Sequence, residues 1–290
     1  MQIMTAAVVI ALIAAFSAFP AAAAETALTL DGGIAATLVT PDAPRPFPAV
    51  IMLHGLGSNR DEVGNLFLDA ADALAERGIA SLRFDFRGFG KSDGDTGAFT
   101  LERQNQDALT ALEALAATPG VDAKRIGVMG FSFGAAAAIE LAGAQPDRIG
   151  ALVTWAPVGD YRADMLDSMG PAIFRRAARD GIVGIDLGWR TLALKQAFFD
   201  SLDRHDLPAA LARYPGAFLT INGSDDPYLK YAPALLQAAA GQDKRALVIP
   251  GGDHMFNVYQ PSRSSAAEVI GITADQFART LAGPAYSPSK

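Results

Sequence analysis

Short, continuous apolar runs recur along the chain and alternate with longer amphipathic stretches. A continuous apolar run is typical of a strand covered on both faces, and such runs occupy residues 49–53, 79–86, 125–129, 149–155, 217–222 and 245–249. Helical spacing of apolar residues, or a high alanine content, marks residues 65–77, 101–117, 135–142, 233–240 and 264–281. Because the two kinds of segment alternate, we predict an α/β fold with a mostly parallel central sheet and helices on both faces.

Two parts of the chain depart from this alternation. Residues 27–30 and 34–40 flank an Asp-Gly-Gly turn, which predicts an opening hairpin. From about residue 158 to residue 206, apolar residues mix with charged ones, and residues 181–188 alternate as in a short hairpin. We therefore expect one domain over residues 25–290 that carries a small inserted cap at 158–206.

The N-terminal segment 1–24 has no charged side chain and runs apolar from Ile3 to Phe19. This apolar region is short for a membrane span, and the alanines up to Ala24 fit a cleavage site before Glu25. We predict a signal peptide over 1–24, a periplasmic or secreted protein, and no stable membrane association after cleavage. Since no Lys or Arg precedes Ile3, an uncleaved N-terminal anchor is the alternative.

Composition excludes several classes of protein. The chain has a formal net charge of −7, and its Lys and Arg residues do not cluster, which argues against nucleic acid or anionic lipid as a partner. It contains no cysteine, so disulfides, thiolate metal sites and a cysteine nucleophile are excluded. No phosphate-binding loop or HExxH helix occurs, so we expect neither a cofactor nor a metal.

The pattern G-x-S-x-G occupies residues 130–134, between the predicted strand 125–129 and the alanine-rich helix 135–142. A serine at such a turn can project its hydroxyl above the end of a sheet, and the flanking glycines relieve the crowding of the backbone. Glycine and serine are common in this chain, so the pattern needs partners elsewhere to carry weight. Ser132 is the candidate nucleophile.

A serine hydroxyl needs an imidazole to take its proton, and the chain offers three histidines. His254 stands in a glycine-bearing loop between a predicted strand and the last helix, where it can reach the carboxyl edge of the sheet. We predict that His254 is the base. His54 precedes the serine and leads into a turn, which favours a structural or loop-orienting role. His205 stands among charged residues and is expected to be solvated.

A carboxylate must hold the imidazole in the useful tautomer, and the loop 222–227 contains two candidates, Asp225 and Asp226. The residues alone do not choose between them, and the unused one is expected to cap the helix before Tyr228. Asp253 is a weaker candidate because adjacent side chains in a loop tend to diverge.

The oxygen of an attacked carbonyl gains negative charge and needs fixed hydrogen-bond donors. The backbone N–H of Phe133 directly follows the candidate nucleophile at a helix start, and that of Leu56 lies in the loop after the early strand. We predict that these two groups form the oxyanion hole.

Five segments, taken in order, resemble the α/β-hydrolase superfamily: residues 54–57 as oxyanion loop, 85–92 as a turn after a strand, 130–134 as nucleophile elbow, 223–227 as acid loop and 252–254 as histidine loop. In that family the acid usually stands three residues after the strand-end glycine, which selects Asp226 over Asp225. The resemblance spans about residues 49–281. Within the superfamily, the chain most resembles bacterial esterases, including cinnamoyl and feruloyl esterases, and serine-aminopeptidase-like hydrolases.

This resemblance implies a serine carboxylesterase that acts on a small-molecule ester through an acyl-enzyme intermediate on Ser132. The cap matches the family only loosely and therefore does not identify the substrate. We expect Phe131, Trp155, Met165 and Trp189 to wall an acyl pocket.

Three alternatives remain open. A thioesterase or a peptidase acting on short peptides would use the same chemistry. An aminopeptidase also needs a carboxylate for the free amine of its substrate, and the cap offers Asp160, Asp164, Asp167 and Asp186. A non-catalytic protein that binds a small apolar ligand is the alternative from a different class. Neither the ester nor the oligomeric state follows from the sequence.

Overall fold

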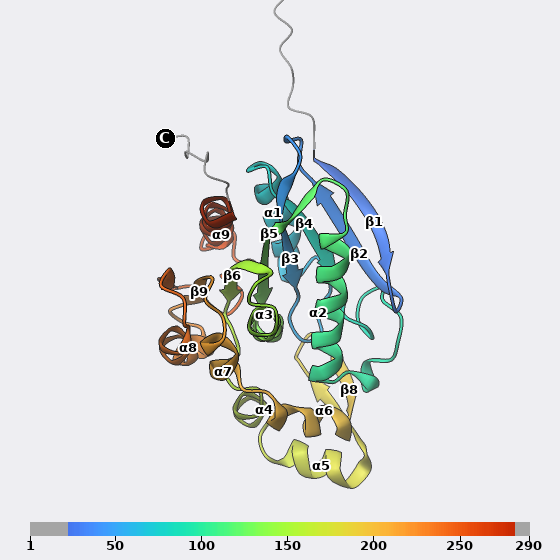
Figure 1. The fold of residues 1–290 in the computed structure, drawn as a ribbon. Helices are drawn as coiled ribbons and strands as arrows, with labels where there is room; N and C mark the ends of the chain where they lie inside the picture. Colours follow the sequence, from blue (N-terminus) through green and yellow to red (C-terminus); the bar gives the residue numbers. More distant parts are fainter. Residues whose placement is uncertain (1–22, 282–290) are drawn as a thin grey trace, which may run out of the picture.

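The computed structural model describes residues 23–281, so residues 1–22 of the predicted signal peptide lie outside the described part. Eight strands form one sheet in the order β1-β2-β4-β3-β5-β6-β9-β10 (Figure 1). These strands are β1 (Ala24–Leu30), β2 (Ile34–Thr40), β3 (Phe47–Leu53), β4 (Ala80–Phe84), β5 (Val121–Phe131), β6 (Ile149–Trp155), β9 (Ala217–Gly223) and β10 (Lys244–Ile249). Strand β2 runs antiparallel to β1 and β4, and the other neighbours are parallel. The predicted opening hairpin and mostly parallel sheet are confirmed.

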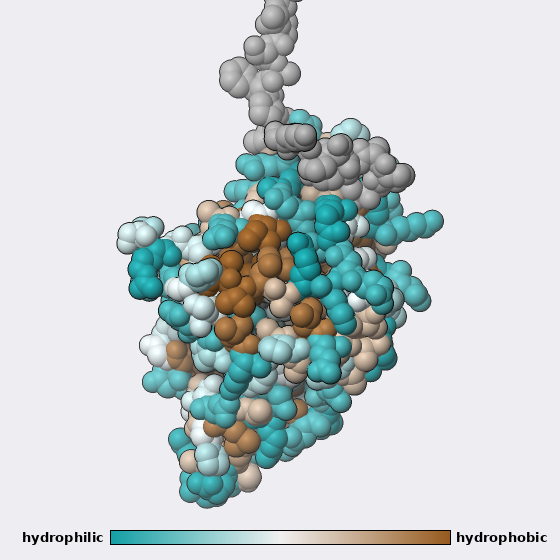
Figure 2. Space-filling view, turned by 90° about the vertical axis from the view of Figure 1, so that its left-hand side faces the viewer, coloured by the Kyte–Doolittle hydropathy of each residue, from teal (hydrophilic) through white to brown (hydrophobic). Residues whose placement is uncertain are grey.

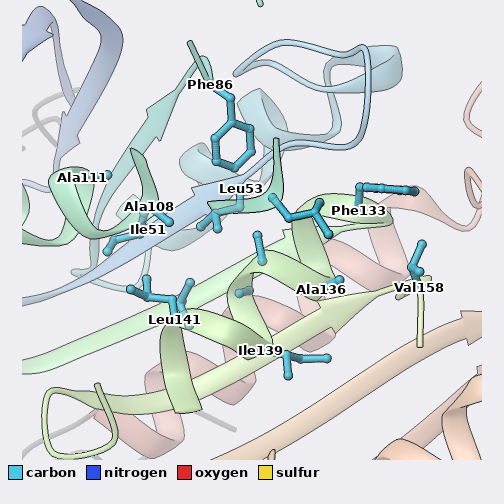
Figure 3. Packing of buried hydrophobic residues seen from close by; sticks show 14 of the residues in the cluster. Ile51, Leu53, Phe86, Ala108, Ala111, Phe133, Ala136, Ile139, Leu141 and Val158 are labelled. Carbon is cyan, nitrogen blue, oxygen red and sulfur yellow. The ribbon is translucent and has the colours of Figure 1, made fainter. Parts of the chain in front are cut away.

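Helices cover both faces of this sheet, as the alternating pattern predicts (Figure 1). One face carries α2 (Leu101–Ala116), α3 (Phe133–Ala144), α7 (Leu207–Ala212) and α8 (Ala232–Ala238), and the other carries α1 (Leu66–Ala75) and α9 (Ala266–Leu281). The alanine-rich helix α3 is buried almost all round, because its small side chains let it lie close to the strands. Figure 3 shows this packing, in which Ile51 and Leu53 of β3 and Ala136 and Ile139 of α3 belong to one buried apolar cluster.

The candidate site lies where the order of the strands reverses. Strand β3 has β4 on one side and β5 on the other, so the chain leaves β3 in one direction and later returns on the opposite side. In open α/β sheets, ligands bind in the crevice outside the carboxyl ends of the strands at such a reversal. Ser132 follows β5 at this point, and the loop 54–58 follows β3.

The inserted segment 158–206 lies beyond the carboxyl edge of the sheet, at the bottom of the view in Figure 1. It contains α4 (Tyr161–Met169), α5 (Ala172–Asp180), β7 (Ile182–Asp186), β8 (Thr191–Lys195), α6 (Gln196–Ser201) and a short 3-10 turn, Leu202–Arg204. The sequence pattern predicts a cap at this place but not its helices, because charged and apolar residues mix there without a clear period.

The predicted cap hairpin is present, but its extent is wrong. Residues 181–188 supply only the first strand, β7, and the second strand is β8, beyond the turn. Val183 pairs with Leu194, and Ile185 pairs with Leu192; all four side chains are buried. The alternation of apolar and polar residues therefore continues through both strands. The apolar face of the hairpin packs into the core of the cap.

The surface at the end of the sheet is mostly polar, with one apolar area. Figure 2 shows the side of the molecule on which β10 ends the sheet, and hydrophobic residues gather in the middle of this face. Val248 of β10 is 48% exposed. Among residues 23–281, no helix combines the length and apolar character needed to cross a membrane. The same residues contain no group of three or more His, Asp or Glu side chains arranged around a possible metal ion.

Candidate active site

Ser132 stands at the sharp turn between β5 and α3. Its φ of 55° and ψ of −120° lie in a region that a residue with a side chain rarely adopts. A Cβ on Gly130 would collide with the backbone carbonyl of Gly134, and a Cβ on Gly134 would collide with that of Leu53. The two glycines of the G-x-S-x-G pattern are therefore what this turn requires.

The loop after β10 brings His254 to the hydroxyl of Ser132. His254 Nε2 lies 3.2 Å from Ser132 Oγ, and His254 Nδ1 lies 3.0 Å from Asp226 Oδ1. A carboxylate only accepts hydrogen bonds, so Nδ1 carries the proton and Nε2 is free to accept one from the serine. The imidazole is packed between Phe131 and Tyr228, with ring centroids 4.9 and 4.6 Å away. The three predicted residues thus form one hydrogen-bonded series.

Asp226, rather than Asp225, meets the histidine. Its side chain is fully buried and also accepts hydrogen bonds from the Tyr228 backbone N–H and the Asn222 side-chain amide, both at 3.0 Å. Asp225 is exposed. The expectation that the unused aspartate caps the following turn is therefore wrong, because Oδ1 of Asp226 contacts the histidine and also accepts from the Tyr228 N–H, which caps this turn.

The other charged residues near these loops hold the loops themselves. Asp253 turns away from its neighbour, and its Oδ1 accepts hydrogen bonds from the backbone N–H groups of Met255 and Asn257 at 2.8 and 2.7 Å. Arg87 forms an ion pair with Asp107 of α2. These contacts agree with the interpretation of residues 85–92 as a packed turn.

His54 is a structural histidine, as predicted. Its Nδ1–H donates to the Gly55 carbonyl at 2.8 Å, and its Nε2 accepts from the Phe86 backbone N–H at 3.0 Å. Burial lowers the pKa of His54 to about 4, so the ring is neutral.

The prediction that His205 is solvated is wrong. Its side chain is only 10% exposed and lies between two carboxylates, with Nδ1 3.4 Å from Glu140 and Nε2 3.7 Å from Glu102. The flanking charged residues point outward, whereas His205 turns inward between α2 and α3, which a local sequence pattern does not reveal.

The two predicted oxyanion donors lie beside Ser132. Phe133 is the first residue of α3, so its N–H has no partner within the helix. Leu56 is in the loop after β3, and among residues 23–281 neither N–H has a hydrogen-bond acceptor. Both groups are free to bind an oxygen held at Ser132.

A cavity of about 780 Å³ opens above these residues, between the loops at the carboxyl edge and the cap. Its lining contains the serine, the histidine and both oxyanion residues, together with Gly55, Ser58, Asn59, Glu62, Val63, Gly64, Asn65, Phe131, Asp164, Met165, Ser168, Met169, Leu187, Trp189, Tyr228, Met255 and Tyr259. A mostly apolar cavity with a few convergent polar groups is typical of a small-molecule site.

Three of the four predicted wall residues, Phe131, Met165 and Trp189, line this cavity. The prediction for Trp155 is wrong. It is fully buried, and its indole N–H donates to the Thr273 hydroxyl at 2.8 Å on the side of the sheet that α9 covers. Strand residues alternate between the two faces, so the last residue of β6 points into the core.

Three titratable residues, Glu62, Asp164 and Tyr228, also line the cavity; of these, only Asp164 was considered from the sequence, as one of four cap aspartates. Burial raises the pKa values of the Glu62 and Asp164 carboxyls, and it raises the pKa of the Tyr228 hydroxyl. Tyr228 stands two residues after Asp226, so its proximity could have been found from the sequence. The other two depend on the fold of a loop and of the cap.

Of the four cap aspartates considered as amine ligands, only Asp164 lines the cavity. Asp160 caps α4, and Asp167 forms an ion pair with Lys230. Asp186 is exposed at the end of β7. Asp164 accepts hydrogen bonds from the Tyr228 and Ser168 hydroxyls.

Comparison with known proteins agrees with this fold. A family model described as the alpha/beta hydrolase family matches residues 50–269. The chain belongs to the α/β-hydrolase family, and the family expected from the sequence is confirmed. Membership indicates a hydrolase.

Individual relatives are more distant. An uncharacterised 31.7 kDa protein of Escherichia coli is 33% identical over 125 residues, or 43% of this chain and 42% of that protein. Esterase FrsA of Yersinia pestis is 34% identical over 128 residues, or 43% of this chain and 28% of that protein. The chain thus matches less than half of the length of these relatives. Est1E from Butyrivibrio proteoclasticus with bound ferulic acid shares the fold, with a TM-score of 0.68 and 23% identity over 87% of this chain and 99% of that chain.

Proposed function

We propose that this protein is a serine carboxylesterase that works through an acyl-enzyme intermediate on Ser132. The observation that carries the proposal is the hydrogen-bonded series Ser132–His254–Asp226, whose serine and histidine line the cavity. This is the arrangement in which a serine becomes a nucleophile at neutral pH. The esterases among the relatives support the choice of an ester as substrate.

In the proposed reaction, Ser132 Oγ attacks the ester carbonyl while His254 Nε2 takes its proton. The N–H groups of Leu56 and Phe133 bind the resulting oxyanion. When the tetrahedral intermediate collapses, the bond to the alcohol oxygen breaks, and His254 returns the proton to that oxygen. Water then attacks the acyl-enzyme with His254 as base, which releases the acid and restores the serine.

The test is a Ser132→Ala variant measured with p-nitrophenyl acetate and a fluorophosphonate probe. We expect kcat to fall by at least about 10³-fold and labelling to disappear, because the nucleophile is missing. Ser262→Ala, an exposed serine outside the cavity, is the matched control. Ester hydrolysis by Ser132→Ala at the rate of the unmutated protein would refute the proposal. An unmutated protein that the probe does not label would point to a binding protein instead.

A second candidate function, cleavage of a peptide with a free amino end, is favoured by one observation. Asp164 is buried in the cavity wall, where an ionised carboxylate could bind an ammonium group. Burial raises the pKa of this carboxyl, which works against the ionised form. The ratio of kcat/KM for an aminoacyl nitroanilide to that for a short-chain ester separates the two functions.

We also propose that the protein is exported and acts outside the cytoplasm, because residues 1–24 have the composition of a signal peptide. N-terminal sequencing of the exported protein should give Glu25 as the first residue. A sequence that starts at Met1 or Gln2 would support the uncleaved anchor.

A further inference from the structure

Glu62 is a buried glutamate that the proposed reaction does not use. It is 5% exposed, lines the cavity and forms no ion pair with a described Lys or Arg. Its φ of 61° and ψ of 172° are strained for a residue with a side chain. Such strain persists only where the surrounding contacts impose it, often at functional sites. The contacts that hold Glu62 in this conformation therefore indicate a functional role.

Both carboxylate oxygens of Glu62 bind donors of two adjoining loops. Oε2 accepts from the Gly55 backbone N–H at 2.6 Å, and Oε1 accepts from the Val63 backbone N–H at 2.8 Å. The Ser58 hydroxyl is a third donor. Glu62 thus connects the loop after β3 with the 3-10 turn that begins at Val63.

The next peptide group of this loop, between Gly55 and Leu56, is also fixed by hydrogen bonds. The carbonyl of Gly55 accepts from His54 Nδ1–H at 2.8 Å and from the Ser58 backbone N–H at 3.1 Å. Gly57, with a φ of 79°, completes a tight turn, and its carbonyl accepts from Arg190 of the cap at 2.7 Å.

These bonds fix the direction of the Leu56 N–H. In a trans peptide the C=O and the following N–H point in opposite directions within one plane. The Gly55 carbonyl faces His54 and Ser58, so the Leu56 N–H of the same peptide points the other way. Glu62 fixes the preceding peptide through the Gly55 N–H.

We propose that Glu62 is a positioning residue of the esterase reaction. By binding the Gly55 N–H it holds the loop so that the next N–H, that of Leu56, meets the oxyanion. This inference rests on the proposed function. The role is geometric, because a negative charge near the oxyanion would by itself raise the energy of the transition state. A fixed donor is what makes an oxyanion hole effective.

The expected loss of kcat can be scaled from what the removal of an oxyanion donor costs in other enzymes. Removal of a complete oxyanion donor costs about 10²–10³ in kcat. Glu62→Gln keeps the shape of the side chain, but its NH₂ group must face the N–H of either Gly55 or Val63, so one hydrogen bond becomes a repulsion. We expect kcat to fall by about 10–100-fold, since the donor is displaced rather than removed. KM should stay within about twofold, because the ground-state ester needs the donor less.

The experiment compares Glu62→Gln, Ser58→Ala and the unmutated protein. Glu76→Gln, the same change at an exposed position at the end of α1, is the matched control. Each protein is measured for kcat and KM with p-nitrophenyl acetate, for inhibition by phenylboronic acid and for its thermal unfolding midpoint. The boronic acid forms a tetrahedral adduct with a serine, and one of its oxygens occupies the oxyanion position.

The expected result is that Glu62→Gln lowers the affinity for phenylboronic acid by a factor similar to its loss of kcat. Glu76→Gln should change neither the affinity nor kcat. A purely structural role would lower the unfolding midpoint and leave the boronic acid affinity of the folded enzyme unchanged, which would overturn the proposal. A folded Glu62→Gln with kcat within about twofold of the unmutated enzyme would do the same.

If Glu62→Gln does not fold, Ser58→Ala decides. It removes one donor to the carboxylate, and kcat and boronic acid affinity should fall together by about 2–5-fold. Unchanged values for this variant would overturn the proposal. Failure of the esterase function itself is recognised separately, because Ser132→Ala would then retain ester hydrolysis.

Discussion

At the scale of single residues, burial decides the protonation state of His54. Both ring nitrogens are satisfied by the backbone, through Gly55 and Phe86, in a form that carries one proton. The ring also packs against Phe86 and Phe89, with centroids 4.8 and 5.9 Å away. A second proton would have no acceptor and would place a charge in the core, so burial lowers the pKa from 6.5 to about 4.

We therefore predict that His54 makes the fold less stable in acid. Between pH 6.5 and about 4, the unfolded chain binds a proton at this residue and the folded one does not, so stability falls as the pH falls. Between about pH 7.5 and about pH 5, linkage gives a loss of about 2 kcal/mol. Urea unfolding of the unmutated protein and of His54→Gln at these two pH values measures the difference.

The comparison isolates His54 from other titrating groups. Glu62, Asp107 and Asp164 have raised pKa values through burial and act in the opposite direction, gaining stability as the pH falls. These three residues are present in both proteins, so their contributions cancel in the difference between the two. If the unmutated protein and His54→Gln lose equal free energy on acidification, His54 does not titrate as predicted.

At the scale of elements, the sequence predicted the sheet far better than the cavity. The central strands β3, β4 and β6 were found because each buries a continuous apolar run, and the elbow was found because its two glycines stand where a Cβ has no room. The inward turn of His205 and the core position of Trp155 depend on which face meets which neighbour, and no local pattern carries that information. For the same reason, Glu62 was missed as a cavity residue, and Asp164 was not distinguished from the three other cap aspartates.

The β7–β8 hairpin is the element that joins the cap to the loop after β3, which contains Leu56. Its turn carries Leu187 and Trp189, which line the cavity, and Arg190, which donates to the Gly57 carbonyl. A Cβ on Gly57 would collide with Leu187, so the hairpin tip lies directly on this loop. Trp189 is 64% exposed and therefore offers an apolar surface that a substrate can cover.

We predict that Trp189→Ala weakens binding of long acyl chains without changing the chemistry. Loss of about 50 Å² of apolar contact corresponds to about 1 kcal/mol, or about fivefold in KM for p-nitrophenyl octanoate. The acetate ester has almost no acyl chain to lay against the indole, so its KM should change much less, and kcat should stay the same for both. Ile182→Ala is the control, since Ile182 is 44% exposed at the start of the same hairpin and does not line the cavity. A KM for the octanoate that does not change would remove Trp189 from the binding surface.

At the scale of the whole molecule, the charges of the chain and of the cavity lining disfavour an anionic ligand. The chain has a net charge of −7, and the described cavity lining contains two carboxyl groups, Glu62 and Asp164, but no Lys or Arg. An anionic ester therefore meets an unfavourable field during approach and finds no cation to replace its hydration in the cavity. Salt screens the first of these effects but hardly alters the second.

We therefore predict that the enzyme prefers p-nitrophenyl butyrate to p-nitrophenyl hemisuccinate, an ester of similar length that ends in a carboxylate. At low ionic strength, kcat/KM for the anionic ester should be lower by about tenfold or more, which corresponds to about 1.4 kcal/mol of transition-state energy. Raising the salt from about 0.01 M to about 0.3 M shortens the screening length several-fold and should recover part of the loss, whereas the butyrate should respond little. Steady-state kinetics with both esters over this range measure the two contributions. Equal kcat/KM values at low salt would mean that the field of the molecule does not reach the site, and substrate choice would then rest on the shape of the cap alone.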